Sequence, residues 1–518
     1  MIAVRRQLRQ INNPMAAALA VAALLCLVWL LSHAIADDAL HGVILLAAAI
    51  VGVFVAGKIL SDWRSGVYLL LTWLLFEDLI RKYMGNNMYV YFAKDVLVGV
   101  TYVSMLTARM RGQDTEIFQP PFKFSLGMFF LLGLVQVFNA NSPSLWYSIL
   151  GLKLYFYYVP LMFVGYALLR TERDLHRFLV VNMGLAGVIA LVGITQAIVG
   201  LDFLNPHSGA DIDYLSHLVR ITPSGQLVTR PPSVFVSDGR FARYMIICLV
   251  LGLGTAGYLL LHSTRGRKLV FPVLALVATG VVVSGSRAVF VFVLVSFVVL
   301  AVAMLWGAPS KLNEAYRLVK ATRRSLIAVV LAGALLAVFF PNVIGARLAF
   351  YRETIMLDSP DSETALRTWD YPVGQLLAAF NDPAWVTGNG IGTASLGAQY
   401  VRRIMGAPER TGSVVESGYG TVVVELGILG LMLWLAWTVS LMFHASKVVL
   451  KLKGTWAFPV GISIFWFMFL LLFPLTYGTM VSYQDFVVNA YFWLSVGILF
   501  RLPTLVRHGA VASTNPAI

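Results

Sequence analysis

The sequence predicts an all-α polytopic membrane protein with about 12–14 transmembrane helices. Of its 518 residues, 59% are hydrophobic and only 12% are charged, with a mean hydropathy of +0.79. A soluble domain carries about 25% charged residues. Apolar runs of about 20 residues, the length that crosses a bilayer, recur from Met15 almost to the C-terminus. They leave room for two long polar loops and for no separate soluble domain.

The predicted helices follow from these apolar runs, and the first of them comes after Arg5, Arg6 and Arg9. Such a start resembles a signal peptide, but the run is long and more spans follow, so we expect an uncleaved first helix. Cys26 and Cys248 both lie inside apolar runs, which argues against a disulfide framework or a thiolate metal site. The predicted spans are 15–35, 42–57, 67–80, 89–108, 124–138, 148–169, 178–199, 241–262, 269–285, 288–306, 326–341, 416–442, 456–474 and 486–500.

The distribution of Lys and Arg predicts the orientation of these helices. With the N-terminus inside, the inner segments carry 24 of these residues and the outer segments 12. Nine of the 12 lie in the two long loops, where the positive-inside rule is weak. We therefore expect both termini in the cytoplasm and both long loops outside. The net charge of +14 is then a topology signal and does not indicate nucleic-acid binding.

The first outer loop is expected to hold a small β-hairpin. Two β-rich runs, 219–222 and 227–230, flank the turn sequence Pro223-Ser224-Gly225-Gln226. His207 and His217 also lie in this loop, but without a third ligand they do not indicate a metal site. The predicted organisation is N-terminal transmembrane helices (1–199), the outer loop (200–240), further transmembrane helices (241–341), a large periplasmic loop (342–415) and C-terminal transmembrane helices (416–518).

The large loop contains its own helical signals and a glycine run. Residues 359–369 carry a cap, a proline and acidic residues at a helix start, and 373–380 form an amphipathic piece after Pro372. Such segments suit a layer along the outer membrane–water interface. The alternating glycines of Gly388-Asn389-Gly390-Ile391-Gly392 let backbone N–H groups approach a partner closely.

Several charged residues fall at membrane depth, where a charge is costly. They are Glu77, Asp78, Lys94, Asp95 and Lys153. One interpretation is an ion-paired structural cluster, or side chains that reach an interface. The other is a proton or ion path, as in a transporter.

Glu416 is the predicted centre of a functional site. It stands at the outer beginning of a helix, whose dipole favours a carboxylate, and Tyr419 lies on the same helical face. Arginine suits phosphate oxygens because its planar group donates two parallel hydrogen bonds. A carboxylate among arginines at an outer membrane face therefore suits a lipid-linked phosphate or pyrophosphate. The outward arginines are Arg240, Arg243, Arg287, Arg347, Arg352, Arg367, Arg402, Arg403 and Arg410, and Arg287 lies in a tight turn between two spans.

From about Arg230 to Trp437 the chain resembles the superfamily of O-antigen ligases and O-antigen or exopolysaccharide polymerases (Wzy-type). The resemblance rests on Ser286-Arg287 opening a span, on the 388–392 glycine run, and on Glu416-Ser417-Gly418-Tyr419 leading into 424–431. It implies a membrane glycosyltransferase that acts on undecaprenyl-pyrophosphate-linked glycans at the periplasmic face of the bacterial inner membrane, without a metal ion or another cofactor. Its expected partners are the lipid-linked donor, a glycan acceptor, the bilayer and a chain-length regulator or export complex, with no nucleic acid.

The resemblance also implies roles for individual residues. Ligases typically carry a histidine at the position of Glu416, so this departure favours a polymerase of glycan repeats over a ligase. Glu416 is the expected catalytic base, and Arg287 and Arg367 are expected to hold the pyrophosphate, together with Arg240 and Arg243. Further substrate contacts are expected from Tyr419, Gly390 and Arg402.

Two other function classes remain open at this point. A secondary transporter or lipid flippase also has many helices with buried charges, although no internal repeat is visible in the sequence. A non-catalytic scaffold of a polysaccharide export complex is the third possibility.

Overall fold

A computed structural model of the chain describes residues 39–85, 87–112, 116–206, 218–221, 227–262, 266–307, 366–405 and 416–514, together with parts of 320–352. The chain divides into two compact units, Met1–Thr115 and Glu116–Ile518. The predicted span 15–35 and most of 326–341 lie outside the described residues.

From residue 39 onward, the first unit consists of α3 (Ala39–Ser61), α4 (Trp63–Tyr83) and α5 (Met88–Met110), which pack against one another. The Asp62 side chain caps α4 by accepting a hydrogen bond from the Ser65 N–H, which supplies a partner that the first turn of a helix lacks. The Ser104 hydroxyl donates to the Ile59 carbonyl (2.8 Å) and joins α5 to α3. The three predicted helices 42–57, 67–80 and 89–108 are thus confirmed.

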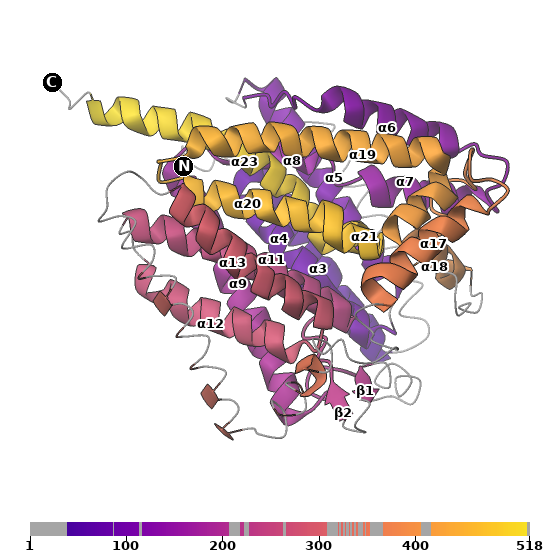
Figure 1. The fold of residues 1–518 in the computed structure, drawn as a ribbon, viewed down its shortest axis with the longest axis horizontal. Helices are drawn as coiled ribbons and strands as arrows, with labels where there is room; N and C mark the ends of the chain where they lie inside the picture. The colour runs from indigo at the N-terminus through magenta and orange to yellow at the C-terminus, as the bar shows by residue number, and fades with distance from the viewer. Residues whose placement is uncertain are drawn as a thin grey trace, which may run out of the picture. The chain divides into compact units, whose positions relative to one another are not determined.

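The second unit confirms the all-α prediction (Figure 1). In the described part of the chain, eight helices are long and apolar enough to cross a membrane, and three shorter helices are also apolar. The principal helices of this unit are α6 (Lys123–Gln136), α7 (Leu145–Phe156), α8 (Leu161–Leu168), α9 (Glu172–Val199), α11 (Asp238–His262), α12 (Arg267–Val283), α13 (Arg287–Trp306), α19 (Gly418–Leu452), α20 (Phe458–Leu470) and α23 (Phe486–Thr514).

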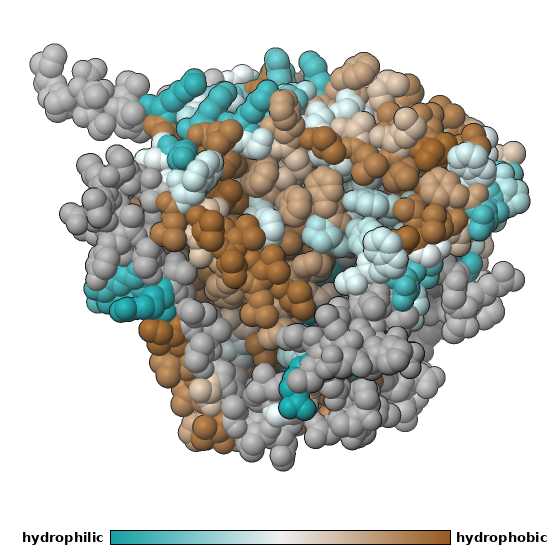
Figure 2. Space-filling model, viewed as in Figure 1, coloured by the Kyte–Doolittle hydropathy of each residue, from teal (hydrophilic) through white to brown (hydrophobic). Residues whose placement is uncertain are grey.

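Helices α11 and α23 form the buried centre of this unit. In the apolar stretches of α11 and α23, 83% and 89% of the residues are buried, whereas in that of α13 only 28% are. Helix α8 packs on α23, and α20 packs on α11. Figure 2 shows apolar side chains over α13 and the helices beside it, which is the composition of a lipid-facing surface. Side chains at the ends of α11 and α23 therefore stand on a rigid core.

The predicted hairpin is present as two antiparallel strands, β1 (Val219–Ile221) and β2 (Leu227–Thr229). Val219 pairs with Thr229, and Ile221 pairs with Leu227. The predicted turn at 223–226 lies outside the described residues.

Within the described residues of the second unit, two membrane helices are interrupted. Helix α19 breaks at Gly427, whose φ of 71° and ψ of −176° are not helical. The stretch after α20 breaks into the π-helix η3 (Leu471–Leu475), α21 (Thr476–Gly478) and α22 (Val481–Gln484) before α23 begins. Pro474 lies in η3 and cannot donate a helical hydrogen bond. Irregular backbone at membrane depth needs partners from the protein, so each break marks a place that other segments must fill.

The large loop contributes a π-helix, η2 (Leu366–Asp370), followed by α17 (Tyr371–Phe380) and α18 (Leu396–Ile404). Helix α17 confirms the helical piece expected after Pro372, which stands in its first turn, and it packs against α19. The expected helix start at 359–365 lies outside the described residues. The sequence did not predict α18.

Candidate functional site

The turn between α12 and α13 brings the hairpin and three arginines together. Gly285 adopts a φ of 66°, a left-handed conformation that a side chain would strain. A Cβ at this position would lie 2.9 Å from the Arg230 side chain, so the turn packs directly on that arginine. The Arg230 guanidinium pairs with Asp238 (2.7 Å) at the start of α11. The sequence had not singled out either Arg230 or Asp238.

Arg347 fixes the hairpin to this turn. Its buried guanidinium donates to the carbonyl of Val283 (3.2 Å) and to the carbonyl and hydroxyl of Thr229 (2.6 and 3.0 Å). Tyr351, one helical turn later, donates to the Val282 carbonyl (2.8 Å). Arg347 therefore stabilises the frame of the site through backbone contacts.

Arg287 opens α13, as the sequence predicted, with Ser286 at the cap position. Its guanidinium lies 3.8 Å from the centre of the Phe350 ring, which is a cation–π contact. The side chain is half-buried, so it stands at the edge of the cluster formed by Arg230, Gly285 and Arg347. We call Arg230, Arg287 and Arg347 the turn arginines.

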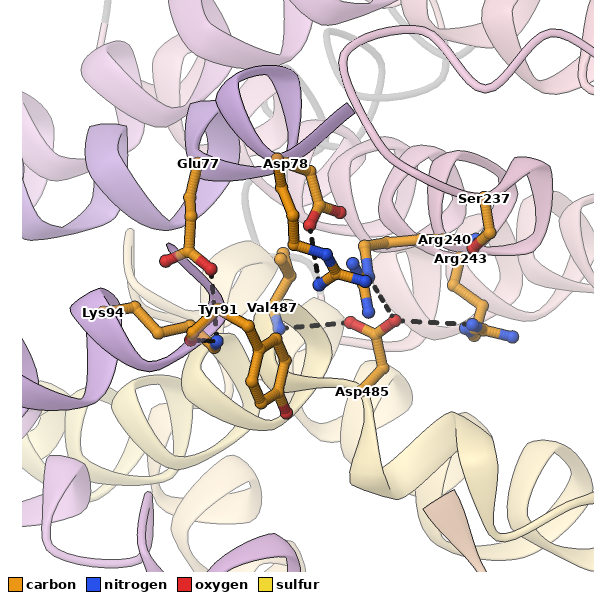
Figure 3. Close-up of polar contacts among 10 residues, drawn as sticks. Glu77, Asp78, Tyr91, Lys94, Ser237, Arg240, Arg243, Asp485 and Val487 are labelled. Atoms are coloured by element: carbon orange, nitrogen blue, oxygen red, sulfur yellow. Dashed lines mark hydrogen bonds and ion pairs between the residues drawn. The ribbon is translucent and has the colours of Figure 1, made fainter. Parts of the chain in front are cut away.

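Arg240 and Arg243, three residues apart in the first turns of α11, meet at one carboxylate (Figure 3). Asp485 accepts hydrogen bonds on Oδ2 from Arg240 Nε (2.8 Å) and Arg243 Nη2 (3.3 Å). Its Oδ1 accepts from the backbone N–H of Val487 (3.1 Å), so the same side chain caps α23. The structure thus confirms that the two arginines lie on one face of α11, and it adds their shared partner Asp485, which sequence reasoning missed. An acidic residue directly before the apolar run 486–500 was its only signal.

Asp485 gives a prediction for the pH dependence of stability. Burial on its own raises the pKa of this carboxyl, but Arg240 and Arg243 outweigh it and hold the pKa below its ordinary value. The stabilisation is therefore complete above the unfolded-state pKa of about 3.9 and is lost as the pH falls through the lower folded-state pKa. Thermal unfolding in detergent should give a higher midpoint for wild type than for Asp485→Asn. This difference in midpoint should be constant from pH 7 to 5 and become smaller below about pH 4. A difference that instead becomes smaller between pH 7 and 5 would contradict this assignment.

Glu416 lies just before the beginning of α19, and its side chain is exposed. The helix cap is Ser417, whose hydroxyl accepts from the Gly420 N–H (3.1 Å). Glu416 is therefore not the capping residue of this helix. Among the described residues, no ion pair joins it to an arginine. Its carboxylate remains accessible beside a helix N-terminus, which favours negative charge.

Tyr419 links the start of α19 to the π-helix that contains Arg367. The Tyr419 ring packs edge-on against Tyr477 (6.1 Å between ring centres). The Tyr477 hydroxyl donates to the Thr368 carbonyl (2.9 Å), next to Arg367 in η2. The backbone of Arg367 is thus held close to the segment that follows Glu416, although its side chain lies outside the described residues.

The glycine run of the large loop fills the break in α19. The Asn389 N–H donates to the Val424 carbonyl (2.8 Å), and the Gly390 N–H donates to the Glu425 carbonyl (3.0 Å). In return, the Ile428 N–H donates to the Trp385 carbonyl (2.9 Å). The close approach that alternating glycines predicted is therefore confirmed, but the partner is α19. The N–H of Gly390 serves this contact in the structure.

Glu425 anchors the same loop from inside the helix. Its buried carboxylate accepts from the Ala394 N–H (2.9 Å) and from the Tyr155 hydroxyl (2.9 Å). Tyr155 comes from α7, so one side chain joins α7, the loop and α19. The sequence did not single out Glu425, although an acid inside an apolar run between Val424 and Leu426 is an available signal.

The interrupted stretch 476–485 contacts the start of α19, helix α18 and the first turns of α11. Gly418 packs so closely on it that a Cβ would overlap the Thr476 carbonyl. Gln484 accepts from the Leu396 N–H (3.2 Å) at the start of α18, the helix that carries half-buried Arg402. Asp485 follows Gln484 and binds the α11 arginines. The segment after Glu416, the helix with Arg402 and the Arg240–Arg243 pair therefore all contact one short stretch of chain.

In the first unit, buried charges form ion pairs (Figure 3). Lys94 donates to Glu77 (3.2 Å) between α5 and α4, and Arg81 donates to Asp78 (3.2 Å) within α4. The Lys94 ammonium also lies 3.1 Å from the centre of the Tyr91 ring. For Glu77, Asp78 and Lys94, this is the ion-paired arrangement that one of the two interpretations expected.

Over the residues that the structure describes, no group of three or more His, Cys, Asp or Glu side chains is arranged to hold a metal ion. No protein-family model matches the chain, and a search of curated proteins finds no matching relative. The chain is a polytopic all-helical membrane protein by helix length and hydropathy.

Proposed function

We propose that the chain is a polysaccharide polymerase that joins undecaprenyl-pyrophosphate-linked oligosaccharide repeats at the periplasmic face of the bacterial inner membrane. The observation that supports it most is the gathering of arginines from separate segments. The turn arginines connect through the Arg230–Asp238 pair to the first turn of α11, which also carries Arg240 and Arg243. Such a cluster, which the predicted topology places on the outer side, suits the two phosphates of a lipid-linked donor.

The proposed chemistry uses a carboxylate base and arginines. Glu416 accepts the proton of an acceptor hydroxyl as its oxygen attacks the anomeric carbon of the donor sugar. The bond between that carbon and the pyrophosphate oxygen breaks, and the electron pair leaves with the polyprenyl pyrophosphate. Arg287, Arg367, Arg240 and Arg243 neutralise the charge on this leaving group, and direct displacement inverts the anomeric centre. The exposed position of Glu416 supports its role, because a base must be accessible to the acceptor.

The test is a gel of surface and lipid-linked glycans from a strain that lacks the gene. If the protein is a polymerase, a single lipid-linked repeat should accumulate in this strain, and complementation with the wild-type gene should restore a ladder of glycans. Polymer that stays on its carrier without reaching its final acceptor would instead indicate a ligase that transfers it to lipid A core or another acceptor. Unchanged glycans would overturn the glycosyltransferase proposal.

Arg367 provides a test of the pyrophosphate contacts. We expect Arg367→Lys to lower polymer formation roughly tenfold or more, because lysine cannot make two parallel hydrogen bonds to phosphate. Arg352→Lys is the matched control, since Arg352 is another outward arginine and is exposed. The readout is the rate of ladder formation in isolated membranes. Equal rates for both variants and wild type would remove Arg367 from the site.

A transporter or flippase is the second candidate, and the two interrupted helices favour it. Transporters use broken helices to bind substrates and ions at the membrane midplane. In this chain, however, backbone groups on both sides of the Gly427 break bond to 385–390. Those groups serve to hold the loop, so the break in α19 supports the placement of the loop better than an ion path. Transport of the lipid-linked repeat would show as repeats retained on the inner face in the deletion strain.

A further inference from the structure

We infer that Asp485 is a positioning residue that orients the Arg240–Arg243 pair and weakens its hold on a diphosphate, so that the leaving group can depart after transfer. The inference rests on the proposed function, because it concerns the diphosphate of the same site.

Asp485 is held in place by backbone N–H groups at one carboxylate oxygen and by the arginines at the other. Its Oδ1 accepts from the N–H groups of Val487 (3.1 Å) and Val488 (3.4 Å), which fixes the carboxylate to the start of α23. The Asp485 side chain is 1% exposed, and α23 is among the most buried helices of its unit. Oδ2 is thereby presented to Arg240 and Arg243 as a fixed acceptor.

The arginines share this one oxygen. Arg240 donates through Nε and Arg243 through Nη2, so Asp485 sets the direction of both guanidinium planes. Phe486 further fixes Arg240, whose guanidinium lies 4.4 Å from the centre of its ring. Within this trio, two positive charges face one negative charge. The trio therefore attracts an anion, but less strongly than two arginines would without the aspartate.

Arg243 is the member of the trio that an anion reaches most readily. Its side chain is 17% exposed, compared with 8% for Arg240. Gly239 stands beside it, and a Cβ there would lie 3.4 Å from Arg243 Nη1. A glycine at this position places no side chain of its own over the guanidinium.

A fixed internal carboxylate has a defined effect on turnover. It repels the bound diphosphate both before and after transfer, so it lowers the affinity for donor and product alike. If product release limits the rate, removal of this charge should lower both KM and kcat. A purely structural role predicts the opposite for binding, because misplaced arginines bind a diphosphate less well.

The test measures binding of inorganic pyrophosphate to the full-length protein in lipid nanodiscs at pH 7.5 by calorimetry. We expect Asp485→Asn to bind at least about tenfold more tightly than wild type, because one repelling charge is removed from a buried site. The single amide oxygen of asparagine still accepts the cap hydrogen bonds of α23, whereas its NH2 group, which cannot accept, takes the place of Oδ2 beside the arginines. Glu116→Gln is the control. Glu116 pairs with Arg501, which lies further along α23, and removal of the Glu116 charge should leave pyrophosphate binding unchanged. If Asp485→Asn does not fold, the same binding measurement is made with Asp485→Ser, which also retains an oxygen that can cap α23.

Equal or weaker binding by the folded variant, or no pyrophosphate binding by wild type, would overturn the inference. The glycan gel separates this result from the proposed function. Tighter binding by Asp485→Asn together with unchanged glycans in the deletion strain would retain the diphosphate site and reject the polymerase. A lost ladder in the deletion strain together with unaltered binding by Asp485→Asn would retain the polymerase and reject the role of Asp485.

Discussion

Replacing Glu416 with glutamine should abolish the glycan ladder while the protein still inserts and folds. Glutamine has nearly the same shape but cannot accept the proton of the acceptor hydroxyl, and loss of a general base lowers a rate about 10²–10⁴-fold. Folding should persist because the Glu416 side chain is exposed and Ser417, not Glu416, caps α19. The measurement is the ladder in a deletion strain complemented with Glu416→Gln, with protein levels in the membrane determined by immunoblot.

The matched control is Asp370→Asn, which removes an exposed carboxylate from the large loop that precedes Glu416. It should restore the ladder as wild type does. If Glu416→Gln also restores a normal ladder at a normal protein level, the catalytic base is not Glu416. The exposed acid at the start of α19 would then belong to the surface of the loop alone.

Periodicity and composition sufficed for the fold because the bilayer imposes simple rules. An apolar run of about 20 residues must be helical when no water satisfies its backbone. The hairpin was also predictable, since two β-rich runs flank a Pro-Ser-Gly turn and the strands Val219–Ile221 and Leu227–Thr229 pair as expected. The breaks at Gly427 and around Pro474 were not, because apolar runs continue through both.

The candidate site was predictable in its residue types and not in its pairings. Arginine in outward segments indicated an anion site, and Arg240 and Arg243 do lie together. Their shared partner Asp485 is about 240 residues away in the sequence, and only the packing of α11 and α23 brings it to them. The same holds for Arg347, whose spacing from Thr229 gives no hint that its donors hold the hairpin.

Gly388→Ala should strongly destabilise the second unit. Gly388 adopts a φ of 76°, and a Cβ there would lie 2.4 Å from the Glu425 carbonyl oxygen, which belongs to rigid backbone. The left-handed conformation alone costs about 1–2 kcal/mol for alanine. The overlap adds to this cost, because relief would require the loop to withdraw from the α19 break and leave the Val424 and Glu425 carbonyls without their hydrogen bonds from 389–390. We therefore expect the free energy of unfolding to fall by at least about 3 kcal/mol, seen as a lower thermal midpoint in detergent and a reduced protein level in the membrane.

Gly374→Ala is the control: Gly374 lies inside α17 with open space at its Cβ position, so alanine should leave stability unchanged or raise it. Similar midpoints for the two variants would show that the glycine run does not need to approach α19 so closely.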